Sequence, residues 1–203
     1  MDRFEKEARE GGYRLIAGVD EVGRGPLAGP VIAACVIWSP LLYGLDIADS
    51  KTLSPKKRAE IVLALREREV VFGLGLADRE EVDRFNVLQA SLKAMAAAVG
   101  SLPQPPDFLL IDGPFIVPTD IEQKSLIKGD QRSISVAAAS VLAKVVRDEL
   151  MDGYHRLFPE YNFASNKGYP TIEHKQALRQ HGYSPFHRLT FRGVAGLRPA
   201  HER

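Results

Sequence analysis

The amino-acid sequence predicts an α/β protein in which helices flank a mixed sheet. Two apolar segments rich in Val and Ile, residues 13–20 and 28–38, are joined by a Gly-rich turn, which indicates an antiparallel hairpin. Later in the chain, short apolar segments alternate with helical ones, and this alternation is typical of parallel strands. We therefore expect antiparallel first strands followed by parallel strands in one sheet.

Two helical regions and a short strand follow the hairpin. The pair Ser54 and Pro55 predicts a helix start, because serine caps helices and proline suits the first helical position; KKRAEIVLALRER then follows at helical spacing. Residues 70–77 predict a short strand. A second helical region begins at Asp78, resumes after Asn86 and ends before the Pro-rich segment LPQPP.

The second half of the chain predicts one more strand and two more helices. Residues 108–112 form an apolar strand that ends on an acid, and the pair Gly113 and Pro114 breaks it. A polar connection leads to a strong helix over 133–151, whose alanine-rich face suits close packing on a sheet. A further helix is expected over 171–181, within a small helical C-terminal part.

The composition excludes several classes of protein. The chain has 203 residues, of which 45% are apolar and 26% charged, as in folded soluble proteins. A single cysteine, Cys35, excludes a disulfide framework and a Cys-based zinc site, and it indicates a reducing compartment. The N-terminal segment is charged, and no apolar segment is long enough for a membrane helix. These features predict a cytoplasmic protein without membrane association.

Charge is distributed unevenly along the chain. The formal net charge is +1, yet residues 156–203 hold eight Lys/Arg and three Asp/Glu, whereas residues 1–155 hold 19 Lys/Arg and 23 Asp/Glu. We expect a core over 1–155 and a basic extension over 156–203 that packs on it as a single structural unit. The extension has two open interpretations: it contacts an anionic partner, or it is an ordinary solvated basic face.

Carboxylates stand at the ends of two predicted strands. Asp20 and Glu21 end the first strand, Asp112 ends a later one, and Asp130 precedes the alanine-rich helix. A buried carboxylate at a strand end is costly unless it is paired, and α/β proteins bind ligands at the carboxyl ends of their strands. If these strands are neighbours, the acids converge on one or two hard cations such as Mg²⁺ or Mn²⁺.

Each acid also has a purely structural interpretation. Asp20 and Glu21 suit a turn with an ion pair to Arg24. Asp112 suits a turn at a strand end, and Asp130 suits a helix-entry loop. Because successive side chains of a strand point to opposite faces, Asp20 and Glu21 are expected to serve one site only if the chain leaves the strand at Glu21.

The Gly-rich turn GRGPLAG, residues 23–29, is not a dinucleotide-binding loop. Its spacing is longer than the G-x-G-x-x-G fingerprint, and the acids before it would repel a pyrophosphate. Two glycines instead let backbone amides approach a ligand, while Arg24 offers a charged fork to a phosphate. No G-x-S-x-G segment occurs, so a serine hydrolase has little support.

Seven segments complete a specific pattern. They are GVDEVGRGPLAGPVIAACVI (18–37), DSKTLS (49–54), NVLQASLKAM (86–95), LLIDG (109–113), KGDQRSISVAAASVLAKVVRD (128–148), NKGYPT (166–171) and HRLTF (187–191). Together, and in this order, they resemble the bacterial ribonuclease HII family, the type 2 ribonucleases H. The resemblance covers nearly the whole chain.

The resemblance implies a ribonuclease H-like fold and an endonuclease. Such an enzyme cuts the RNA strand of RNA/DNA hybrids and nicks on the 5′ side of single ribonucleotides embedded in duplex DNA, which gives it a role in ribonucleotide excision. The family's catalytic and metal-binding carboxylates fall on Asp20, Glu21, Asp112 and Asp130. A two-metal mechanism with Mg²⁺ or Mn²⁺ needs no protein nucleophile and leaves 3′-hydroxyl and 5′-phosphate ends.

The resemblance also implies residues that bind the substrate. Gly23, Arg24 and Gly25 fall on the family's G-R-G motif, which reads the ribose 2′-hydroxyl at the scissile junction. Tyr169 falls on its K-G-Y-P motif, whose tyrosine packs near the junction sugar; without the resemblance, this tyrosine is an ordinary loop aromatic.

Several further residues keep two interpretations. Lys51 and Asn86 lie in matching segments and are expected to bind the substrate backbone, with a surface role as the alternative. Asp148 lies four residues after Lys144, which favours an ion pair on one helix face over a role in the site. The HR pair at 187–188 either touches a phosphate or packs the C-terminal segment.

Other function classes fit the sequence less well. A non-catalytic module that binds hybrids would not need four intact acids, and a DNA-directed nuclease or resolvase would not need the Gly-Arg-Gly turn. The expected partners are an RNA/DNA hybrid and ribonucleotide-containing duplex DNA. We expect a monomer, and no clamp-binding peptide is recognisable near the C-terminus, so a sliding-clamp contact has no support from the sequence.

Overall fold

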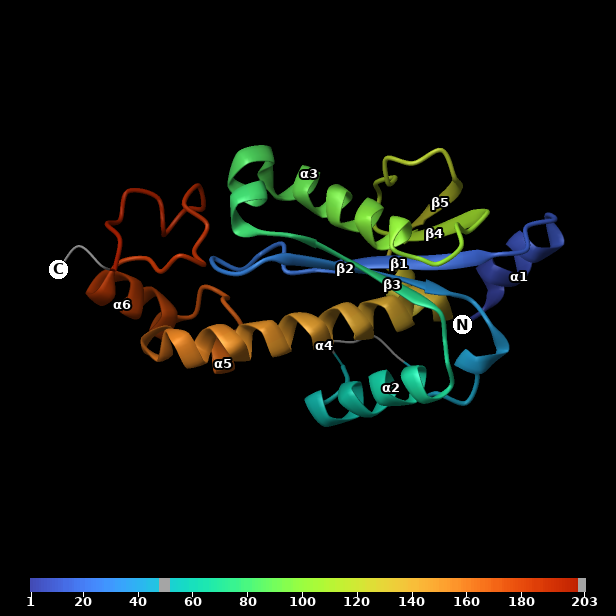
Figure 1. Ribbon diagram of the computed structural model, residues 1–203, viewed down its shortest axis with the longest axis horizontal. Coiled ribbons are helices and arrows are strands. Elements are labelled where there is room, and N and C mark those ends of the chain that lie inside the picture. The colour runs from blue at the N-terminus through green and yellow to red at the C-terminus, as the bar shows by residue number, and fades with distance from the viewer. Residues whose placement is uncertain (48–51, 201–203) are drawn as a thin grey trace.

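The structure is a computed structural model that describes residues 1–47 and 52–200. Its strands are β1 (Ile16–Val22), β2 (Val31–Ile37), β3 (Phe72–Ala77), β4 (Phe108–Asp112) and β5 (Glu122–Leu126). Within these residues they form a five-stranded sheet in the order β3-β2-β1-β4-β5 (Figure 1). β2 is antiparallel to both β1 and β3, whereas β4 is parallel to both β1 and β5. The predicted mixed sheet is confirmed.

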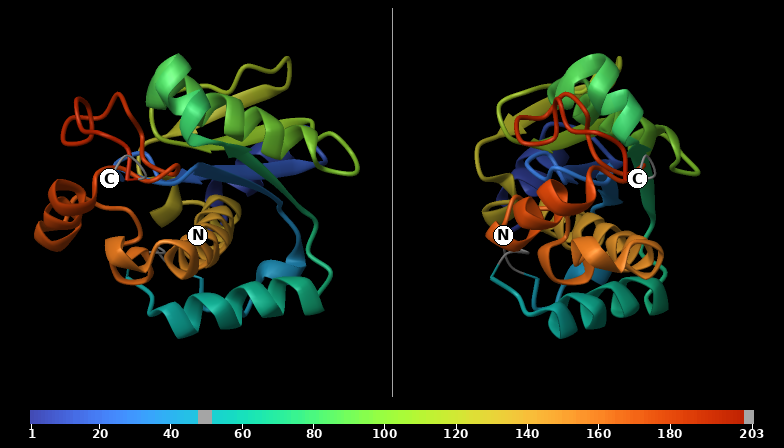
Figure 2. Two further views of the ribbon diagram at one scale, coloured as in Figure 1. Left: turned by 60° about the vertical axis from the view of Figure 1, so that its left-hand side comes forward. Right: turned by 90° about the vertical axis from the view of Figure 1, so that its left-hand side faces the viewer.

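Helices cover both faces of the sheet. The α-helices are α1 (Arg3–Glu10), α2 (Pro55–Glu67), α3 (Arg79–Gly100), α4 (Ile134–Leu157), α5 (Phe163–Asn166) and α6 (Ile172–His181), and the 3₁₀ helices are η1 (Pro40–Leu42), η2 (Gly129–Gln131) and η3 (Pro159–Tyr161). α3 lies on one face and α4 on the other, with α2 outside α4; α5 and α6 lie beyond one end of the sheet (Figure 2). In the described part of the chain, each helix is too short or too polar to cross a lipid bilayer.

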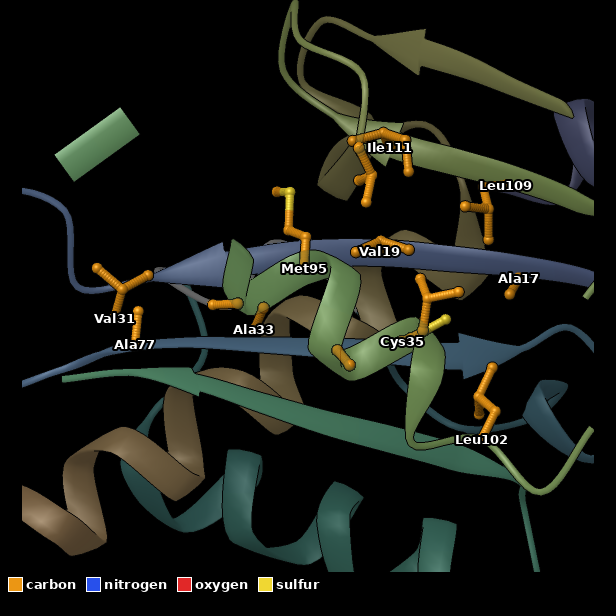
Figure 3. Packing of buried hydrophobic residues seen from close by; sticks show 14 of the residues in the cluster. Ala17, Val19, Val31, Ala33, Cys35, Ala77, Met95, Leu102, Leu109 and Ile111 are labelled. Carbon is orange, nitrogen blue, oxygen red and sulfur yellow. The ribbon is translucent and has the colours of Figure 1, made fainter. Parts of the chain in front are cut away.

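Alternate strand residues build the core beneath α3. Ala17 and Val19 of β1 lie on the same side as Cys35 of β2 and Ile111 of β4, and they pack against Met95 of α3 (Figure 3). Their sequence neighbours point to the opposite face, as in a sheet that is buried on both sides. Cys35 is a fully buried core side chain, and this burial raises the pKa of its thiol to about 12.

The alanine-rich helix α4 packs closely on the opposite face. Ala137, Ala138 and Ala139 have no exposed surface. Gly18 of β1 leaves room for the helix backbone, because a Cβ at this position would lie 2.2 Å from the backbone nitrogen of Val136. The predicted close packing of this helix on the sheet is confirmed, and it depends on small residues from both elements.

Side-chain caps begin two helices at the predicted residues. Ser54 Oγ accepts the Lys57 N–H at 3.2 Å at the start of α2. Asp78 and Glu81 form a reciprocal capping box at the start of α3. Asn86 then interrupts α3 with a φ of 68°, and its side chain accepts amides of the following turn. The helical pattern that resumes after Asn86 is therefore a second helical segment with its own cap.

α1, α5 and β5 are additional to the predicted elements, and α4 is longer than predicted. β5 occurs where a polar connection is expected, and α1 occurs in the charged N-terminal segment. β5 is an edge strand, and its pairing with β4 stabilises it. Most of its side chains face solvent, so its sequence has no apolar pattern that would predict a strand. α4 continues past the expected end at residue 151 to Leu157, where basic side chains favour its last turn.

The C-terminal part packs against the turn between β1 and β2. Leu27 and Ala28 of that turn share a buried cluster with Met151 of α4 and with Tyr161 and Phe163. Because α4 runs without interruption through residue 155, the expected boundary lies inside a helix.

Candidate active site

A pocket of about 340 Å³ opens at the carboxyl ends of β1 and β4. Most of the residues predicted for the site meet there, although they come from distant parts of the chain. The residues that line it are Asp20, Glu21, Val22, Gly23, Arg24, Gly25, Asp112, Ser140, Lys144 and Tyr169.

Asp20 and Glu21 reach the pocket from opposite faces of β1. Asp20 lies on the face that packs against α4, and Glu21 lies on the face that packs against α3. The expectation that the chain must leave the strand at Glu21 is wrong, because β1 continues to Val22. Both side chains still serve one pocket because β4 ends at Asp112, beside Asp20, and leaves the rest of that edge of β1 open.

Burial and mutual repulsion perturb two of these acids. Burial raises the pKa of Asp20 well above its usual value, and the negative charges of Glu21 and Asp112 raise it further. Burial also raises the pKa of Glu21, although the Arg24 guanidinium, 3.2 Å from its carboxylate, opposes this shift. The acids thus carry more negative charge than Arg24 neutralises, and a divalent cation would relieve their repulsion.

The donor set fits a hard divalent cation. The three carboxylates offer oxygen ligands, and none of the described residues that line the pocket is a histidine or a cysteine. Across residues 1–47 and 52–200, however, no three His, Cys, Asp or Glu side chains stand close enough together to enclose a metal ion. The acids line a shared pocket, and they would have to approach one another to hold a cation.

Asp112 and Asp130 lie at the entry to α4. Asp112 Oδ1 accepts the Gly129 N–H at 2.7 Å, so the strand-end acid is anchored to the loop that precedes the helix. Asp130 lies next to this amide in η2 and is only 6% exposed, but it is not among the residues that line the pocket. Of the four predicted carboxylates, three line the pocket and Asp130 does not.

Arg24 takes part in the ion pair that the structural interpretation expects. Its Nη1 lies 3.2 Å from Glu21 Oε1, yet 41% of its side chain remains exposed. The ion pair and a role in the site are compatible, because Glu21 and Arg24 line the same pocket.

Tyr169 is 40% exposed, and a chain of hydrogen bonds holds its backbone. His174 Nδ1 bonds the Tyr169 carbonyl at 2.8 Å, His174 Nε2 meets His187 Nε2 at 2.9 Å, and His187 Nδ1 receives the Ser184 N–H at 2.9 Å. A carbonyl at one end and an amide at the other require that both histidines be neutral, with His187 donating to His174.

The pKa values of the two histidines agree with this arrangement. Burial, together with the neighbouring His174, lowers the pKa of His187 to about 3. Burial lowers the pKa of His174 as well. Of the two interpretations of His187, the structure supports packing of the C-terminal segment, because this side chain has no exposed surface.

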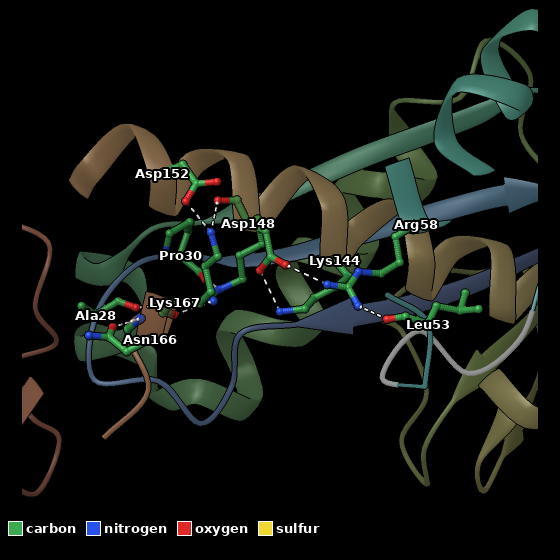
Figure 4. A network of polar contacts seen from close by, with 11 residues as sticks. Ala28, Pro30, Leu53, Arg58, Lys144, Asp148, Asp152, Asn166 and Lys167 are labelled. Carbon is green, nitrogen blue, oxygen red and sulfur yellow. Dashed lines mark hydrogen bonds and ion pairs between the residues drawn. The ribbon is translucent and has the colours of Figure 1, made fainter. Parts of the chain in front are cut away.

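Asn86 and Asp148 do not line the pocket. Lys51 lies outside the described residues. Asn86 is exposed at the kink of α3, where it caps a helical segment and does not line the pocket. The expected ion pair between Lys144 and Asp148 is present at 2.7 Å, and Arg58 joins it at 3.4 Å (Figure 4).

Two polar residues of the pocket were not predicted as part of the site. Ser140 interacts with the Asp20 carboxylate and lowers its pKa, and Lys144 lines the pocket while it pairs with Asp148. The two lie four residues apart, so they share one face of α4. Polar side chains that interrupt an alanine-rich helix at this spacing are the signal that would have indicated them.

Comparisons with known proteins identify the family and agree with the fold. The family model for ribonuclease HII matches residues 17–194. Ribonuclease HII of Syntrophus aciditrophicus (strain SB) is 49% identical over 192 residues, which are 95% of this chain and 91% of the relative.

Solved structures share the fold. Ribonuclease H2 from Pyrococcus horikoshii OT3 has a TM-score of 0.75 at 24% identity, with 89% of this chain and 95% of that chain covered. A chain of the PCNA:RNase HII complex from Archaeoglobus fulgidus has a TM-score of 0.75 at 22% identity, with 88% and 96% covered. With this sheet, this pocket and the match along residues 17–194, the chain belongs to the ribonuclease HII family, whose members are endonucleases of the ribonuclease H type that act on RNA/DNA hybrids.

Proposed function

We propose that this protein also nicks duplex DNA on the 5′ side of a single embedded ribonucleotide and thereby begins its excision. One observation carries the proposal: three carboxylates from two strand ends share a pocket with the Gly-Arg-Gly turn and Tyr169. The acidic part of this pocket suits phosphodiester hydrolysis, and the turn with the tyrosine suits recognition of a sugar.

Asp20, Glu21 and Asp112 are the proposed ligands of two divalent cations, Mg²⁺ or Mn²⁺, and Asp130 supports them from behind. When bound, such cations activate the attacking water and neutralise the leaving 3′-oxygen. The protein's own part is to hold the acids: the Gly129 amide fixes Asp112, and Arg24 restrains Glu21. No protein nucleophile is needed, and the ends formed are a 3′-hydroxyl and a 5′-phosphate.

The turn over residues 23–25 is the proposed reader of the 2′-hydroxyl. This hydroxyl marks RNA within DNA, and a fixed backbone can bond to it without reading bases. The N–H groups of Arg24 and Gly25 donate to no partner within residues 1–47 and 52–200, and both residues line the pocket. A Cβ on Gly25 would lie 3.7 Å from the Tyr169 ring, so the ring flanks the space where the sugar would lie.

The proposal extends to partners and setting. The substrates are the hybrid and the ribonucleotide-containing duplex, and the protein acts as a monomer in the cytoplasm. Residues 1–155 and 156–203 act as one unit, a proposal that the buried cluster of Leu27, Met151 and Phe163 supports.

A nicking assay tests the proposal. The substrate is an end-labelled DNA duplex with one internal ribonucleotide, and the control is the all-DNA duplex of the same sequence. We expect one nick on the 5′ side of the ribonucleotide, loss of the nick with a chelator, and its return with excess Mg²⁺ or Mn²⁺. Cutting of the all-DNA duplex at a similar rate would refute the proposal.

The variant Asp20→Asn tests the acidic part of the pocket. It keeps the size of the side chain but removes a buried carboxylate, so we expect nicking to fall by more than about 100-fold. Thermal stability should stay the same or rise, because repulsion with Glu21 and Asp112 is removed. Asp120→Asn, at an exposed acid, is the control. Near-normal nicking by Asp20→Asn would remove this residue from the proposed site.

A further inference from the structure

A buried arginine holds the Gly-rich turn from behind. Arg188 has no exposed surface, and its guanidinium faces the backbone carbonyls of residues 23–29. Nε donates to Gly29 at 3.0 Å, Nη1 donates to Arg24 at 3.0 Å and to Pro26 at 2.9 Å, and Nη2 donates to Gly23 at 2.6 Å and to Gly29 at 2.8 Å. A guanidinium has five N–H donors, so this single turn uses all of them.

A second arginine holds the end of the same turn. Arg147 is also fully buried, and it donates Nη2 to Ala28 and Nε to Pro30, each at 3.0 Å. The Leu27 N–H donates to the Gly168 carbonyl at 2.8 Å, which joins the turn to the segment that carries Tyr169. The two halves of the proposed sugar site are therefore connected through the backbone.

Burying these two arginines costs free energy, and packing alone does not require it. Two guanidinium groups are buried near each other, and their mutual repulsion adds to the cost of removing each from water. An apolar side chain could fill the same space without that cost, but it could not bond several carbonyls at once. The planar fork of arginine can, because its donors point in fixed directions.

The hydrogen bonds to these carbonyls also restrict the N–H groups on the opposite side of the turn. The carbonyls of Gly23, Arg24 and Pro26 are engaged by Arg188, on the buried side. The N–H groups of Arg24 and Gly25 have no partner within the part of the chain that the structure describes, and these residues line the pocket. Fixing the carbonyls thus restricts the rotation of the peptide groups that carry these amides.

We infer that Arg188 is a positioning residue, which fixes the turn over residues 23–29 so that its free amides are held ready for the ribose of the substrate. The inference rests on the proposed function, because it concerns how the 2′-hydroxyl is read. It also settles the two interpretations of the HR pair for this arginine: a side chain with no exposed surface does not reach a phosphate.

The variant Arg188→Lys tests the inference. It keeps the charge but offers at most three donors, so the turn should loosen. We expect kcat/KM for the single-ribonucleotide duplex to fall about 10- to 100-fold, the usual effect of losing a residue that orients a binding group. Hydrogen exchange followed by mass spectrometry should show faster exchange in the peptide that covers residues 23–29.

Two controls separate positioning from general stability. Arg66→Lys changes an exposed arginine of α2 and should alter neither readout. Leu65→Ala removes a fully buried side chain of α2, in a different cluster from the turn, and its loss of thermal stability provides a reference for general destabilisation. Against this reference, Arg188→Lys should show the larger increase of exchange in residues 23–29 and the larger loss of kcat/KM.

The outcomes distinguish the inference from the proposed function. The inference is overturned if the backbone amides of residues 23–29 exchange no faster in Arg188→Lys than in the Leu65→Ala reference. It is also overturned if they exchange faster while kcat/KM stays unchanged. A wild-type protein that cuts hybrids but ignores the single ribonucleotide would refute the proposed function instead. In that case the exchange data would still decide whether Arg188 holds the turn.

Discussion

Gly23 and Gly25 flank the same arginine but are glycine for different reasons. Gly23 has a φ of 100°, and a Cβ there would lie 2.4 Å from Arg147 Nε, so the fold itself requires glycine. Gly25 has no such backbone angle, and a Cβ would meet only the Tyr169 ring, at an ordinary contact distance of 3.7 Å. At Gly25 the missing side chain leaves space in the pocket rather than relieving strain.

Alanine at these two positions should therefore separate stability from activity. Gly23→Ala should lower the free energy of unfolding by about 2 kcal/mol or more, through strain at positive φ and overpacking against Arg147. Gly25→Ala should change it by less than about 0.5 kcal/mol, yet reduce nicking at a single ribonucleotide about 10-fold or more. Urea denaturation and the nicking assay measure the two effects. Wild-type nicking by Gly25→Ala would show that the substrate does not approach this residue.

The link between the Tyr169 segment, helix α6 and the segment near His187 is a chain of neutral groups. Protonation of His174 would place two donors against each other between His174 and His187, whereas protonation of His187 would place its Nδ1–H against the Ser184 N–H. The folded state therefore excludes protons that the unfolded chain accepts, and this couples the placement of the tyrosine loop to pH.

Stability should fall as the solution becomes acidic. The folded-state pKa of His187, about 3, lies below the ordinary value of 6.5, so its contribution is complete above the ordinary pKa and is lost as pH falls toward the folded one. The expected loss is at most about 1.4 kcal/mol per pH unit for this histidine. Carboxylates titrate in the same range, so urea denaturation must compare wild type with His187→Gln, whose pH dependence should be flatter. Parallel curves for the two proteins would contradict the assignment.

At the scale of the whole molecule, a formal charge of +1 hides the basic C-terminal extension. Two of its charges are less available to a nucleic-acid backbone. Arg188 is fully buried, and Lys167 is paired with Asp152. The basic residues of this extension that are exposed within the described chain are Arg156, Lys175, Arg179, Arg192 and Arg198.

If the exposed set contacts the hybrid backbone, it should control the salt dependence of binding. A plot of the logarithm of the binding constant against the logarithm of the salt concentration has a negative slope. Replacing these residues with glutamine should make this slope less steep by about 0.9 for each phosphate that the protein no longer neutralises. Binding is measured with Asp20→Asn, which prevents cleavage. The control variant replaces Lys56 and Arg66 of α2 with glutamine, which is the same kind of change on another helix. An unchanged slope for the C-terminal set would favour the other interpretation, a solvated basic face.

Local patterns were sufficient to predict most of the elements. Strands β1 to β4 show apolar runs, and helices α2 and α3 begin at side-chain caps, so neighbouring residues specify each of them. β5 was missed because an edge strand depends on its partner β4 and not on its own pattern. The acids at the ends of β1 and β4 were also recognisable locally, since a carboxylate that follows an apolar strand is unusual.

Contacts between distant segments decided the rest. Whether Asp130 lines the pocket depends on how η2 packs, and Asn86 caps a helical segment at the kink of α3. In the sequence, Arg188 is one basic residue among several; only the turn packed around it shows a buried group that bonds backbone carbonyls. Acids at strand ends can thus be located from neighbouring residues, whereas the burial and direction of a side chain follow from three-dimensional contacts that no local pattern specifies.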